Sequence, residues 1–255
     1  MIKILDSQDY YQSKIVTKLL IMNKNIDQDE LQKFADLAEK WWDSSGEFKP
    51  LHVINPIRAS YISSKVDLTD LNVLDVGCGG GLLTEALFDF EAKVTGIDVA
   101  GPGIEIAKMH AEKSNKPINY EVATAEDFSK EHTNHFDVVT CLEVLEHVPD
   151  PGSLIQACST MLKKDGLLFL STINRNPRSW ITAIVGAEYI FNILPKGTHE
   201  FEKFIKPSEL AEFMEQASIK LLEAKGLFYN PISHRANLNN DLGVNYMVYG
   251  INEAN

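Results

Sequence analysis

The spacing of hydrophobic positions changes along the chain, and each spacing predicts a different kind of element. From Asp27 onward apolar side chains recur near a helical period, and Asp27 with Glu30 resembles an N-terminal capping pair. Farther along, short apolar runs alternate with helical stretches. The runs typical of buried strands cover residues 72–76, 93–98, 118–122, 136–140 and 166–172, and the helical stretches cover residues 57–66, 82–90, 104–113, 153–162 and 208–217.

This alternation predicts the fold class. Strands that alternate with helices at such spacing form a parallel sheet with helices on both faces. Two later strand-like runs, 221–229 and 245–251, would add an antiparallel hairpin at the C-terminal edge. We therefore expect a doubly wound α/β fold with a mostly parallel, seven-stranded sheet. Residues 27–255 would form this single domain, and residues 1–26 would be an N-terminal extension outside it.

Composition narrows the class of protein further. The chain has 255 residues, of which 44% are hydrophobic, enough for a sizeable core. Its formal net charge of -12 argues against a nucleic-acid partner, because such proteins bind phosphates through basic surfaces. The three cysteines form no CxxC pair, so we expect neither a zinc cluster nor a disulfide framework.

The N-terminal residues carry no sign of a targeting segment. Charged residues interrupt the apolar positions there, and no arginine precedes Arg58, which argues against both a signal peptide and a transit peptide. No apolar stretch reaches the roughly 20 residues of a membrane-spanning helix. These features predict a cytoplasmic protein.

A glycine-rich loop joins the first strand to the helix after it. Segment 75–81 reads Asp-Val-Gly-Cys-Gly-Gly-Gly. Asp75 lies near the end of the expected strand, and Gly77, Gly79 and Gly81 form the turn after it. Glycine permits close approach of a ligand and positive φ angles. We expect bare backbone N–H groups here, with the carboxylate of Asp98, at the end of the next strand, placed to accept from both hydroxyls of a ribose.

A nicotinamide dinucleotide is the rival ligand for this loop. The dinucleotide fingerprint GxGxxG requires glycine at position 82, where this chain has Leu82. A third glycine at position 81 and the acid at position 75 favour a cofactor that carries a sulfonium and no phosphate. The loop therefore favours S-adenosylmethionine over NAD.

Longer segments of the chain are more specific than the glycine loop. They are 41–43 (Trp-Trp-Asp), 46–52 (Gly-Glu-Phe-Lys-Pro-Leu-His), 55–58 (Asn-Pro-Ile-Arg), 136–148 (Phe-Asp-Val-Val-Thr-Cys-Leu-Glu-Val-Leu-Glu-His-Val), 171–176 (Ser-Thr-Ile-Asn-Arg-Asn), 186–189 (Gly-Ala-Glu-Tyr) and 195–199 (Pro-Lys-Gly-Thr-His). With these segments the chain resembles the ubiquinone-biosynthesis O-methyltransferases, of the class I S-adenosylmethionine-dependent superfamily, from about residue 31 to residue 249.

The resemblance implies a reaction and a set of cofactor contacts. The reaction would transfer a methyl group from S-adenosylmethionine to a phenolic hydroxyl of a polyprenylated catechol or hydroquinone, 3-demethylubiquinol or 2-polyprenyl-6-hydroxyphenol. Ala125 and Glu126, after the third strand, stand where such folds hold the adenine ring. Arg58 would pair with the methionine carboxylate. The resemblance also implies cofactor contacts at Gly77, Asp98 and Leu142.

Three residues after the fourth strand are candidate metal ligands. Glu143, Glu146 and His147 stand at i, i+3 and i+4, so on a helical turn they would share one face. Two carboxylates and an imidazole suit Mg²⁺ or another divalent cation, which would stabilise a phenolate. In related eukaryotic enzymes of the family these positions are regarded as the metal site. The alternative is that both glutamates are solvated and His147 acts as a base.

Histidines are the candidate general bases. His147 is the first candidate, as ligand or as base, and His199 is the second, in a segment where a lid would lie. His52 is a third, although a lone loop histidine is more often merely exposed. Trp41 and Trp42 would either pack over the substrate or fix the N-terminal helix to the core.

An apolar insert at about residues 175–206 suggests peripheral membrane contact. Within residues 180–195 only Glu188 is charged, and this length is too short to span a bilayer comfortably. An apolar helix with basic flanks is typical of one that lies on an anionic membrane surface. The alternative is a buried helix that covers the active site. The flanking basic residues are Arg175, Arg178, Lys196, Lys203 and Lys206.

Other functions remain open on the sequence alone. The same cofactor loop would serve a methyltransferase that acts on a different small molecule. It would also serve a non-catalytic cofactor-binding scaffold in a complex of ubiquinone-pathway enzymes, which are candidate partners in either case. An NAD-dependent oxidoreductase is the fold-sharing rival that Leu82 disfavours.

Overall fold

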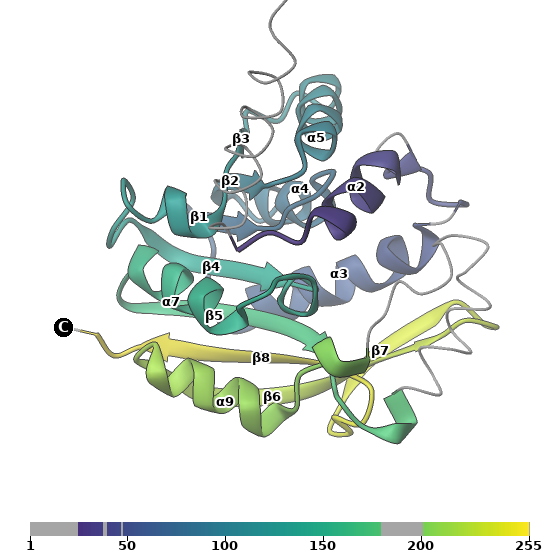
Figure 1. The fold of residues 1–255 in the computed structure, drawn as a ribbon. Coiled ribbons are helices and arrows are strands. Elements are labelled where there is room, and N and C mark those ends of the chain that lie inside the picture. Colours follow the sequence, from purple (N-terminus) through teal and green to yellow (C-terminus); the bar gives the residue numbers. More distant parts are fainter. Residues whose placement is uncertain (1–24, 38–39, 47, 180–200, 255) are drawn as a thin grey trace, which may run out of the picture.

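The computed structural model describes residues 25–254 with three gaps, at 38–39, 47 and 180–200 (Figure 1). The described residues form one eight-stranded sheet in the order β3-β2-β1-β4-β5-β8-β6-β7. The five strands of its parallel part are β1 (Asn72–Val76), β2 (Lys93–Asp98), β3 (Asn119–Val122), β4 (Phe136–Leu142) and β5 (Leu162–Ile173).

The C-terminal strands complete the sheet in antiparallel fashion. β8 (Asn245–Asn252) lies between β5 and β6 (Ile219–Asn230) and runs antiparallel to both. β7 (Arg235–Asn239) pairs with β6 at the edge, where Leu227 stands opposite Leu238. The predicted antiparallel C-terminal hairpin is confirmed, as is the doubly wound fold.

The strand count differs from the prediction of seven. The extra strand is β7, whose sequence Arg-Ala-Asn-Leu-Asn lacks the apolar run that marks the other strands. It forms because the end of β6 supplies backbone partners from Gly226 to Asn230. Pairing, rather than burial, makes this segment a strand.

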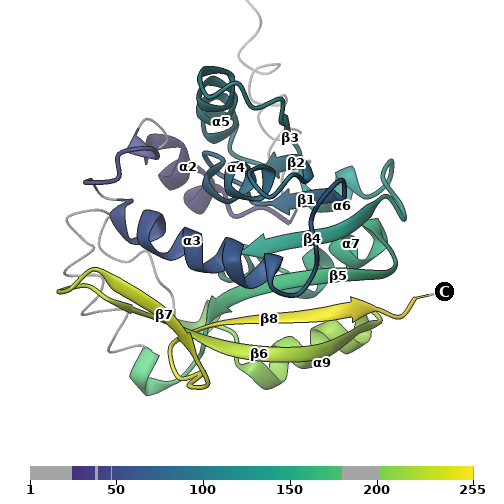
Figure 2. The ribbon, with the colours of Figure 1, turned by 180° about the vertical axis from the view of Figure 1, so that it is seen from behind.

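Helices cover both faces of the sheet. α3 (Lys49–Ser63) and α4 (Leu82–Phe88) pack on one face, where Ile62 and Leu87 are fully buried against residues such as Phe169. α7 (Pro151–Met161) and α9 (Pro207–Gln216) pack on the other, with Ile155 and Leu210 in that core. Figures 1 and 2 show these layers from opposite sides. The remaining helices are α2 (Gln28–Leu37), α5 (Gly101–Lys113), α6 (Ala125–Phe128) and the 3-10 turns η2 (Leu145–His147) and η3 (Phe201–Lys203).

One predicted helix boundary is wrong. The helix expected at 57–66 begins earlier, at Lys49, because Pro50 lies in its first turn, where a proline costs no hydrogen bond, and the helix continues through Pro56.

Asn25, in the segment expected to lie outside the domain, contacts two residues of the fold. The Asn25 side chain donates to Glu126 Oε1 at 2.9 Å and accepts from the amide of Asp150 at 2.7 Å. Residues 1–24 lie outside the described part of the chain.

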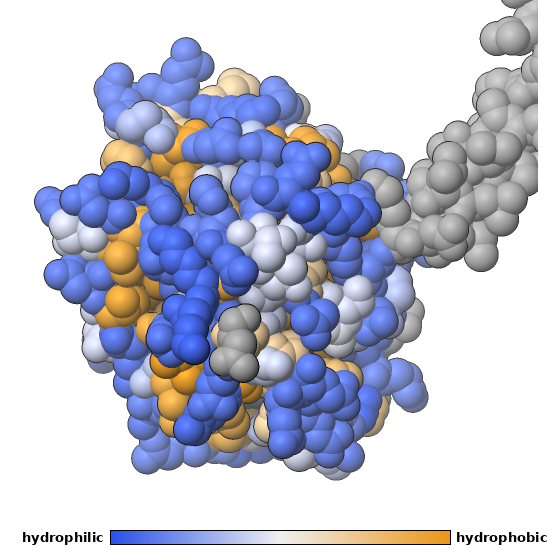
Figure 3. Space-filling model, turned by 90° about the vertical axis from the view of Figure 1, so that its left-hand side faces the viewer, coloured by the Kyte–Doolittle hydropathy of each residue, from blue (hydrophilic) through white to orange (hydrophobic). Residues whose placement is uncertain are grey.

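Two surface features lie away from the carboxyl ends of the strands. A depression of about 620 Å³ is lined by residues 63–69 and 89–91, which precede β1 and β2. The face in Figure 3 shows hydrophobic patches separated by hydrophilic side chains. Among the described residues, no helix is both long enough and apolar enough to cross a bilayer.

Candidate functional site

The candidate site lies at the carboxyl ends of the parallel strands. The loop 77–81 follows β1, Asp98 ends β2, and Leu142 ends β4. β1 pairs with both β2 and β4, so these three ends are neighbours at one edge of the sheet (Figure 1). Open α/β sheets bind their ligands at this edge.

The loop requires glycine for steric reasons. Gly77 and Gly79 have φ angles of 71° and 52°, in the left-handed region that side chains disfavour. A Cβ on Gly77 would lie 2.2 Å from Cγ2 of Val144. Gly81 also has a positive φ and is the N-cap of α4. The glycine pattern therefore follows from the backbone that this site needs.

The expectation of bare N–H groups is wrong for four of the five amides of this loop. The amides of Gly77 and Cys78 both donate to the carbonyl of Ile97, at 2.8 and 3.1 Å. The amide of Gly79 donates to Asp98 Oδ2 at 2.9 Å, and that of Gly81 to the carbonyl of Cys78. The loop is thus held by β2, and what it offers a ligand is close approach to its α carbons. A cofactor without phosphate has no need of free amide donors.

Asp98 has a double role in this geometry. Its carboxylate accepts from the amides of Gly79, at 2.9 Å, and Ala100, at 2.7 Å, which ties the glycine loop to the start of α5. Burial raises the pKa of Asp98, while these amide bonds oppose the rise. A carboxylate has about four lone-pair positions, so two remain for ribose hydroxyls.

Asp75 lies inside the protein rather than at the ligand face. It is 2% exposed and accepts from Thr84 Oγ1 and Thr140 Oγ1, both at 2.7 Å. Burial is the main cause that raises the pKa of Asp75 to about 6. The predicted cofactor contact is thus a support that joins β1 to α4 and β4.

The predicted adenine side lies after β3. Ala125 begins α6 and is buried, and Thr124 caps this helix by accepting from the amide of Asp127. Glu126 Oε1 accepts from Asn25 Nδ2 at 2.9 Å and from Ser153 Oγ at 3.1 Å. The Asn25 contact could not be predicted, because it joins residues 101 positions apart.

Trp41 and Trp42 contact the glycine loop, which neither sequence-based alternative anticipated. The indole of Trp42 donates to the carbonyl of Gly80 at 2.9 Å. The ring of Trp41 lies against Gly79 and Gly80, so that a Cβ on either glycine would overlap it. His52, the third candidate base, contacts the carbonyl of Trp41 through Nε2 at 3.0 Å. In this structure His52 is thus a support of the tryptophan segment.

Arg58 and Glu143 form an ion pair beside the end of β4. Nη2 of Arg58 lies 2.8 Å from Glu143 Oε1, and Arg58 is only 6% exposed. Its Nε is buried without a hydrogen-bond partner among the described residues. Glu143 also accepts from Ser171 Oγ at 2.6 Å and Asn245 Nδ2 at 2.8 Å. A buried guanidinium with unused donor capacity suits an anionic group of a ligand.

The predicted metal ligands do not share a helical face. Glu143 has a φ of 58°, and only residues 145–147 form a 3-10 turn, so the assumed i, i+3, i+4 geometry is absent. Glu146 is buried and accepts from Thr172 Oγ1 at 2.8 Å. Among the described residues, no three His, Cys, Asp or Glu side chains are grouped to hold an ion. The donor set as folded therefore does not fit a divalent cation.

Burial dominates the electrostatics of this turn. It raises the pKa of Glu146 to about 7, and the neighbouring Glu143 adds to the rise. The carboxyl group of Glu146 is therefore about half protonated near pH 7.

Glu30 of α2 is the partner of His147, and the sequence did not single it out for this role. The Nδ1 of His147 lies 2.8 Å from Glu30 Oε2, and Glu30 is 6% exposed. Burial lowers the pKa of His147, but the bond to Glu30 and the nearby Glu146 and Glu143 outweigh it and raise the pKa overall. A carboxylate on Nδ1 fixes the orientation of the ring and increases its basicity.

Relatives of known name match most of this chain. The methyltransferase domain family matches residues 26–224. The ubiquinone biosynthesis O-methyltransferase of Marinobacter nauticus is 51% identical over 229 residues, which cover 89% of this chain and 96% of the relative. That of Haemophilus ducreyi is 52% identical over 228 residues, with 88% and 97% covered. The chain belongs to the ubiquinone biosynthesis O-methyltransferases.

Solved structures agree with this O-methyltransferase in fold. A SAM-dependent methyltransferase of Thermotoga maritima superposes with a TM-score of 0.62 at 16% identity, covering 87% of this chain and 99% of that one. The magnesium protoporphyrin IX methyltransferase of Synechocystis PCC 6803, with bound SAH, gives a TM-score of 0.58 at 15% identity, covering 77% and 81%. The predicted class I fold and dependence on S-adenosylmethionine are confirmed.

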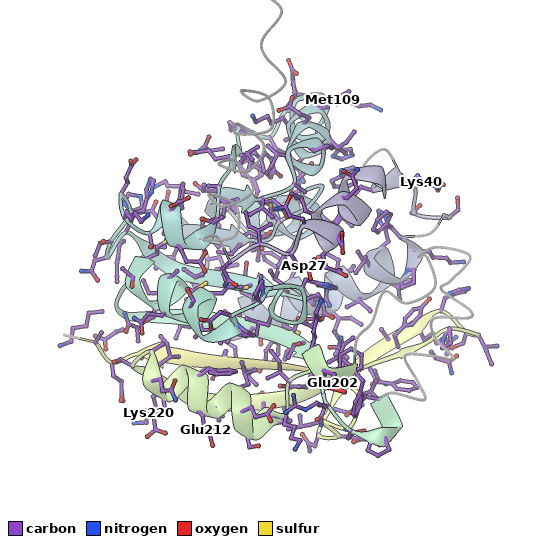
Figure 4. The ribbon with its side chains drawn as sticks, viewed as in Figure 1. Asp27, Lys40, Met109, Glu202, Glu212 and Lys220 are labelled. Atoms are coloured by element: carbon purple, nitrogen blue, oxygen red, sulfur yellow. The ribbon has the colours of Figure 1, made fainter. Side chains whose placement is uncertain are left out.

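The remaining predictions for this O-methyltransferase concern the insert. His199 and the apolar residues 180–195 lie outside the described part of the chain. Several of the basic residues that flank them bond to carboxylates. Lys203 Nζ lies 2.8 Å from Oδ2 of Asp27, which is labelled in Figure 4. Arg175 pairs with Glu209, and Arg178 Nη1 lies 2.7 Å from Asp241 Oδ2. The expected basic excess is therefore partly neutralised by the fold.

Proposed function

We propose that this enzyme transfers a methyl group from S-adenosylmethionine to a phenolic hydroxyl of a polyprenylated catechol in ubiquinone biosynthesis. The observation that carries the proposal is about 50% identity over about 90% of the chain to enzymes of that name. The site supports it, because a glycine loop with positive φ angles, an acid at the end of β2 and a buried arginine lie near the carboxyl ends of the parallel strands. The proposed substrates are 3-demethylubiquinol and 2-polyprenyl-6-hydroxyphenol.

The proposed cofactor site combines an acidic side chain, Asp98, with a basic one, Arg58. Asp98 would accept from the ribose hydroxyls, and Arg58 would bind the methionine carboxylate with the donor that lacks a partner. The other proposed contacts are Gly77, Gly79, Gly81, Ala125, Glu126 and Leu142. When bound, the cofactor supplies an electrophilic methyl group on a positively charged sulfur.

His147 is the proposed general base. A phenol has a pKa near ~10 and is a weak nucleophile at neutral pH, so removal of its proton is the task of the protein. The imidazole of His147 takes this proton while the phenolic oxygen forms a bond to the methyl carbon and the carbon–sulfur bond breaks. Glu30 stabilises the resulting imidazolium from the Nδ1 side. His199, outside the described residues, is the second proposed base.

The metal prediction does not enter this mechanism. Mg²⁺ at Glu143, Glu146 and His147 was predicted from spacing and resemblance, and the folded donors do not fit it. We therefore route no step through a metal ion. A chelator in the methyl-transfer assay measures whether a divalent cation contributes from another arrangement.

Methyl transfer to a short-chain catechol tests the proposal. Removal of a general base typically costs about 10²–10⁴-fold, so we expect His147→Gln to lower kcat by this range and Glu30→Gln to lower it less. Binding of S-adenosylhomocysteine by both variants should match that of the wild type. His135→Gln, an exposed histidine before β4, is the matched control.

Two outcomes would contradict different parts of this proposal. Full activity of His147→Gln would exclude the role of His147 as base. Cofactor binding by the wild type without turnover of any catechol would leave the non-catalytic scaffold as the better explanation.

We also propose that the enzyme is cytoplasmic and contacts the membrane peripherally through the apolar insert at about 175–206. A substrate with a long isoprenoid tail resides in the bilayer, and the sequence of residues 180–195 is apolar except for Glu188. Other ubiquinone-pathway enzymes are proposed partners at that surface.

A further inference from the structure

A short segment of the chain crosses the glycine loop of the cofactor site. Residues 40–46, called the strap, join α2 to α3, and Lys40 at its start is labelled in Figure 4. Asp43 shapes the strap by accepting from the amide and hydroxyl of Ser45 at 2.9 and 2.8 Å. The amide of Gly46 donates to the carbonyl of Asp43 at 3.1 Å. The strap is therefore a defined turn rather than an arbitrary connection.

The ring of Trp41 rests directly on the loop. A Cβ at Gly79 would lie 2.2 Å from Cζ2 of Trp41, and one at Gly80 would lie 2.3 Å from Cγ. Because Gly79 and Gly80 have no side chains, the indole can lie directly against their backbone. The same two glycines belong to the loop that the cofactor must contact, so ring and cofactor compete for one surface.

The polar atom of this ring has no partner. Nε1 of Trp41 is buried without a hydrogen bond among the described residues. A buried indole N–H normally finds an acceptor, and leaving it without one carries a free-energy cost. The covered arrangement is held instead by apolar contact, since the rings of Trp41 and Phe48 lie 4.5 Å apart. If the ring moved into solvent, Nε1 of Trp41 could donate a hydrogen bond to water.

The next residue anchors the strap independently of Trp41. The Trp42 ring stacks on that of His110 at 3.3 Å and an interplanar angle of 3°, and its Nε1 donates to the carbonyl of Gly80. His110 Nδ1 lies 2.6 Å from Oε1 of Glu85, which is 3% exposed on α4. This chain of contacts fixes the ring of Trp42, whereas the ring of Trp41 makes only packing contacts among the described residues.

We propose that Trp41 is a gate on the cofactor site, whose ring covers Gly79 and Gly80 and swings away when the cofactor binds, while Trp42 keeps the strap attached. The gate rests on the cofactor role of the loop. It adds a rate-controlling residue that the cofactor motifs do not contain. A ring that were simply a fixed wall of the site would leave the rate of cofactor association unchanged when truncated.

Surface plasmon resonance with S-adenosylhomocysteine measures both rates. We expect Trp41→Ala to raise the association rate constant about two- to tenfold, the range that corresponds to loss of one aromatic contact. Trp41→Phe, with a smaller ring, should fall between Trp41→Ala and the wild type. Phe228→Ala removes an aromatic side chain that is 47% exposed on β6 and should leave both rates unchanged.

A second measurement follows the unmodified ring. The chain has three tryptophans, so the Trp42→Phe, Trp180→Phe double variant reports Trp41 alone. Saturating S-adenosylhomocysteine should shift its emission, and an unchanged spectrum would overturn the gate. This readout decides the matter even if Trp41→Ala fails to fold.

The outcomes separate the gate from the cofactor assignment. Normal binding by the wild type with an unchanged or slower association rate in folded Trp41→Ala would overturn the gate alone. Absence of binding by the wild type would overturn the cofactor assignment and the gate with it.

Discussion

Asp75 is one of three buried carboxyl groups, with Asp98 and Glu146, whose raised pKa values make stability depend on pH. Its pKa of about 6 in the folded protein, raised by burial, exceeds the ordinary value of 3.8. Between about pH 4 and pH 6 the unfolded chain has lost this proton while the folded protein keeps it. The free energy of unfolding therefore falls as pH rises through this window, by about 3 kcal/mol in total.

Asp75→Asn should remove this dependence, because an amide does not titrate. The oxygen and the nitrogen of the asparagine amide can still form hydrogen bonds with Thr84 and Thr140. We expect the stability of the variant relative to wild type to rise between pH 4 and pH 7 in urea unfolding. Glu131→Gln, on the surface, is the control. Parallel pH curves for Asp75→Asn and wild type would contradict the role of burial.

Single residues of the site were predictable when their role is local. Gly77 and Gly79 follow from the backbone of one turn, and Asp98 from the length of one strand–helix–strand unit. Glu30 could not be predicted, because its bond to His147 joins positions 117 apart. The predicted metal ligands were placed on one helical turn because of their spacing. Glu143 has a positive φ, so the chain is not helical there.

At the scale of elements, Trp42 of the strap connects α5 to the loop before α4. Trp42→Phe removes the indole hydrogen bond to Gly80 and keeps an aromatic ring for the stack on His110. We expect the free energy of unfolding to fall by about 0.5–1.5 kcal/mol, the usual net value of one hydrogen bond. Urea unfolding at neutral pH measures it. A loss well above about 3 kcal/mol would mean that the stack on His110 is lost as well.

Elements were predictable where burial alone defines them. The central parallel strands β1, β4 and β5 appear as apolar runs because helices cover both of their faces, whereas β3 at the edge is largely exposed. β7 escaped detection because a paired edge strand needs no apolar run. The start of α3 was missed because Pro50 suggested a loop. Proline is in fact common in the first turn of a helix, where Pro50 lies.

For the whole molecule, membrane attachment should depend on the insert more than on charge. Arg175, Arg178 and Lys203 bond to carboxylates of the fold, so fewer free cations remain for an anionic surface. We expect the protein to float with anionic liposomes and to stay bound when salt is raised. Replacement of Ile184 and Phe191 by Asp should abolish flotation.

The control for that experiment is another apolar site. Ile232, in the turn between β6 and β7, is 83% exposed, and Ile232→Asp should leave flotation unchanged. A wild-type protein that remains at the bottom of the gradient would exclude the membrane proposal.

The place of β8 has a consequence for how the chain is made. Of the eight strands it is the last to leave the ribosome, yet it lies between β5 and β6 and supplies backbone partners to both. Until it emerges, β5 and β6 each expose an unpaired edge, and exposed edges invite pairing with other chains. A nascent chain stalled before residue 245 should therefore aggregate, although every residue proposed to touch the cofactor has already been synthesised.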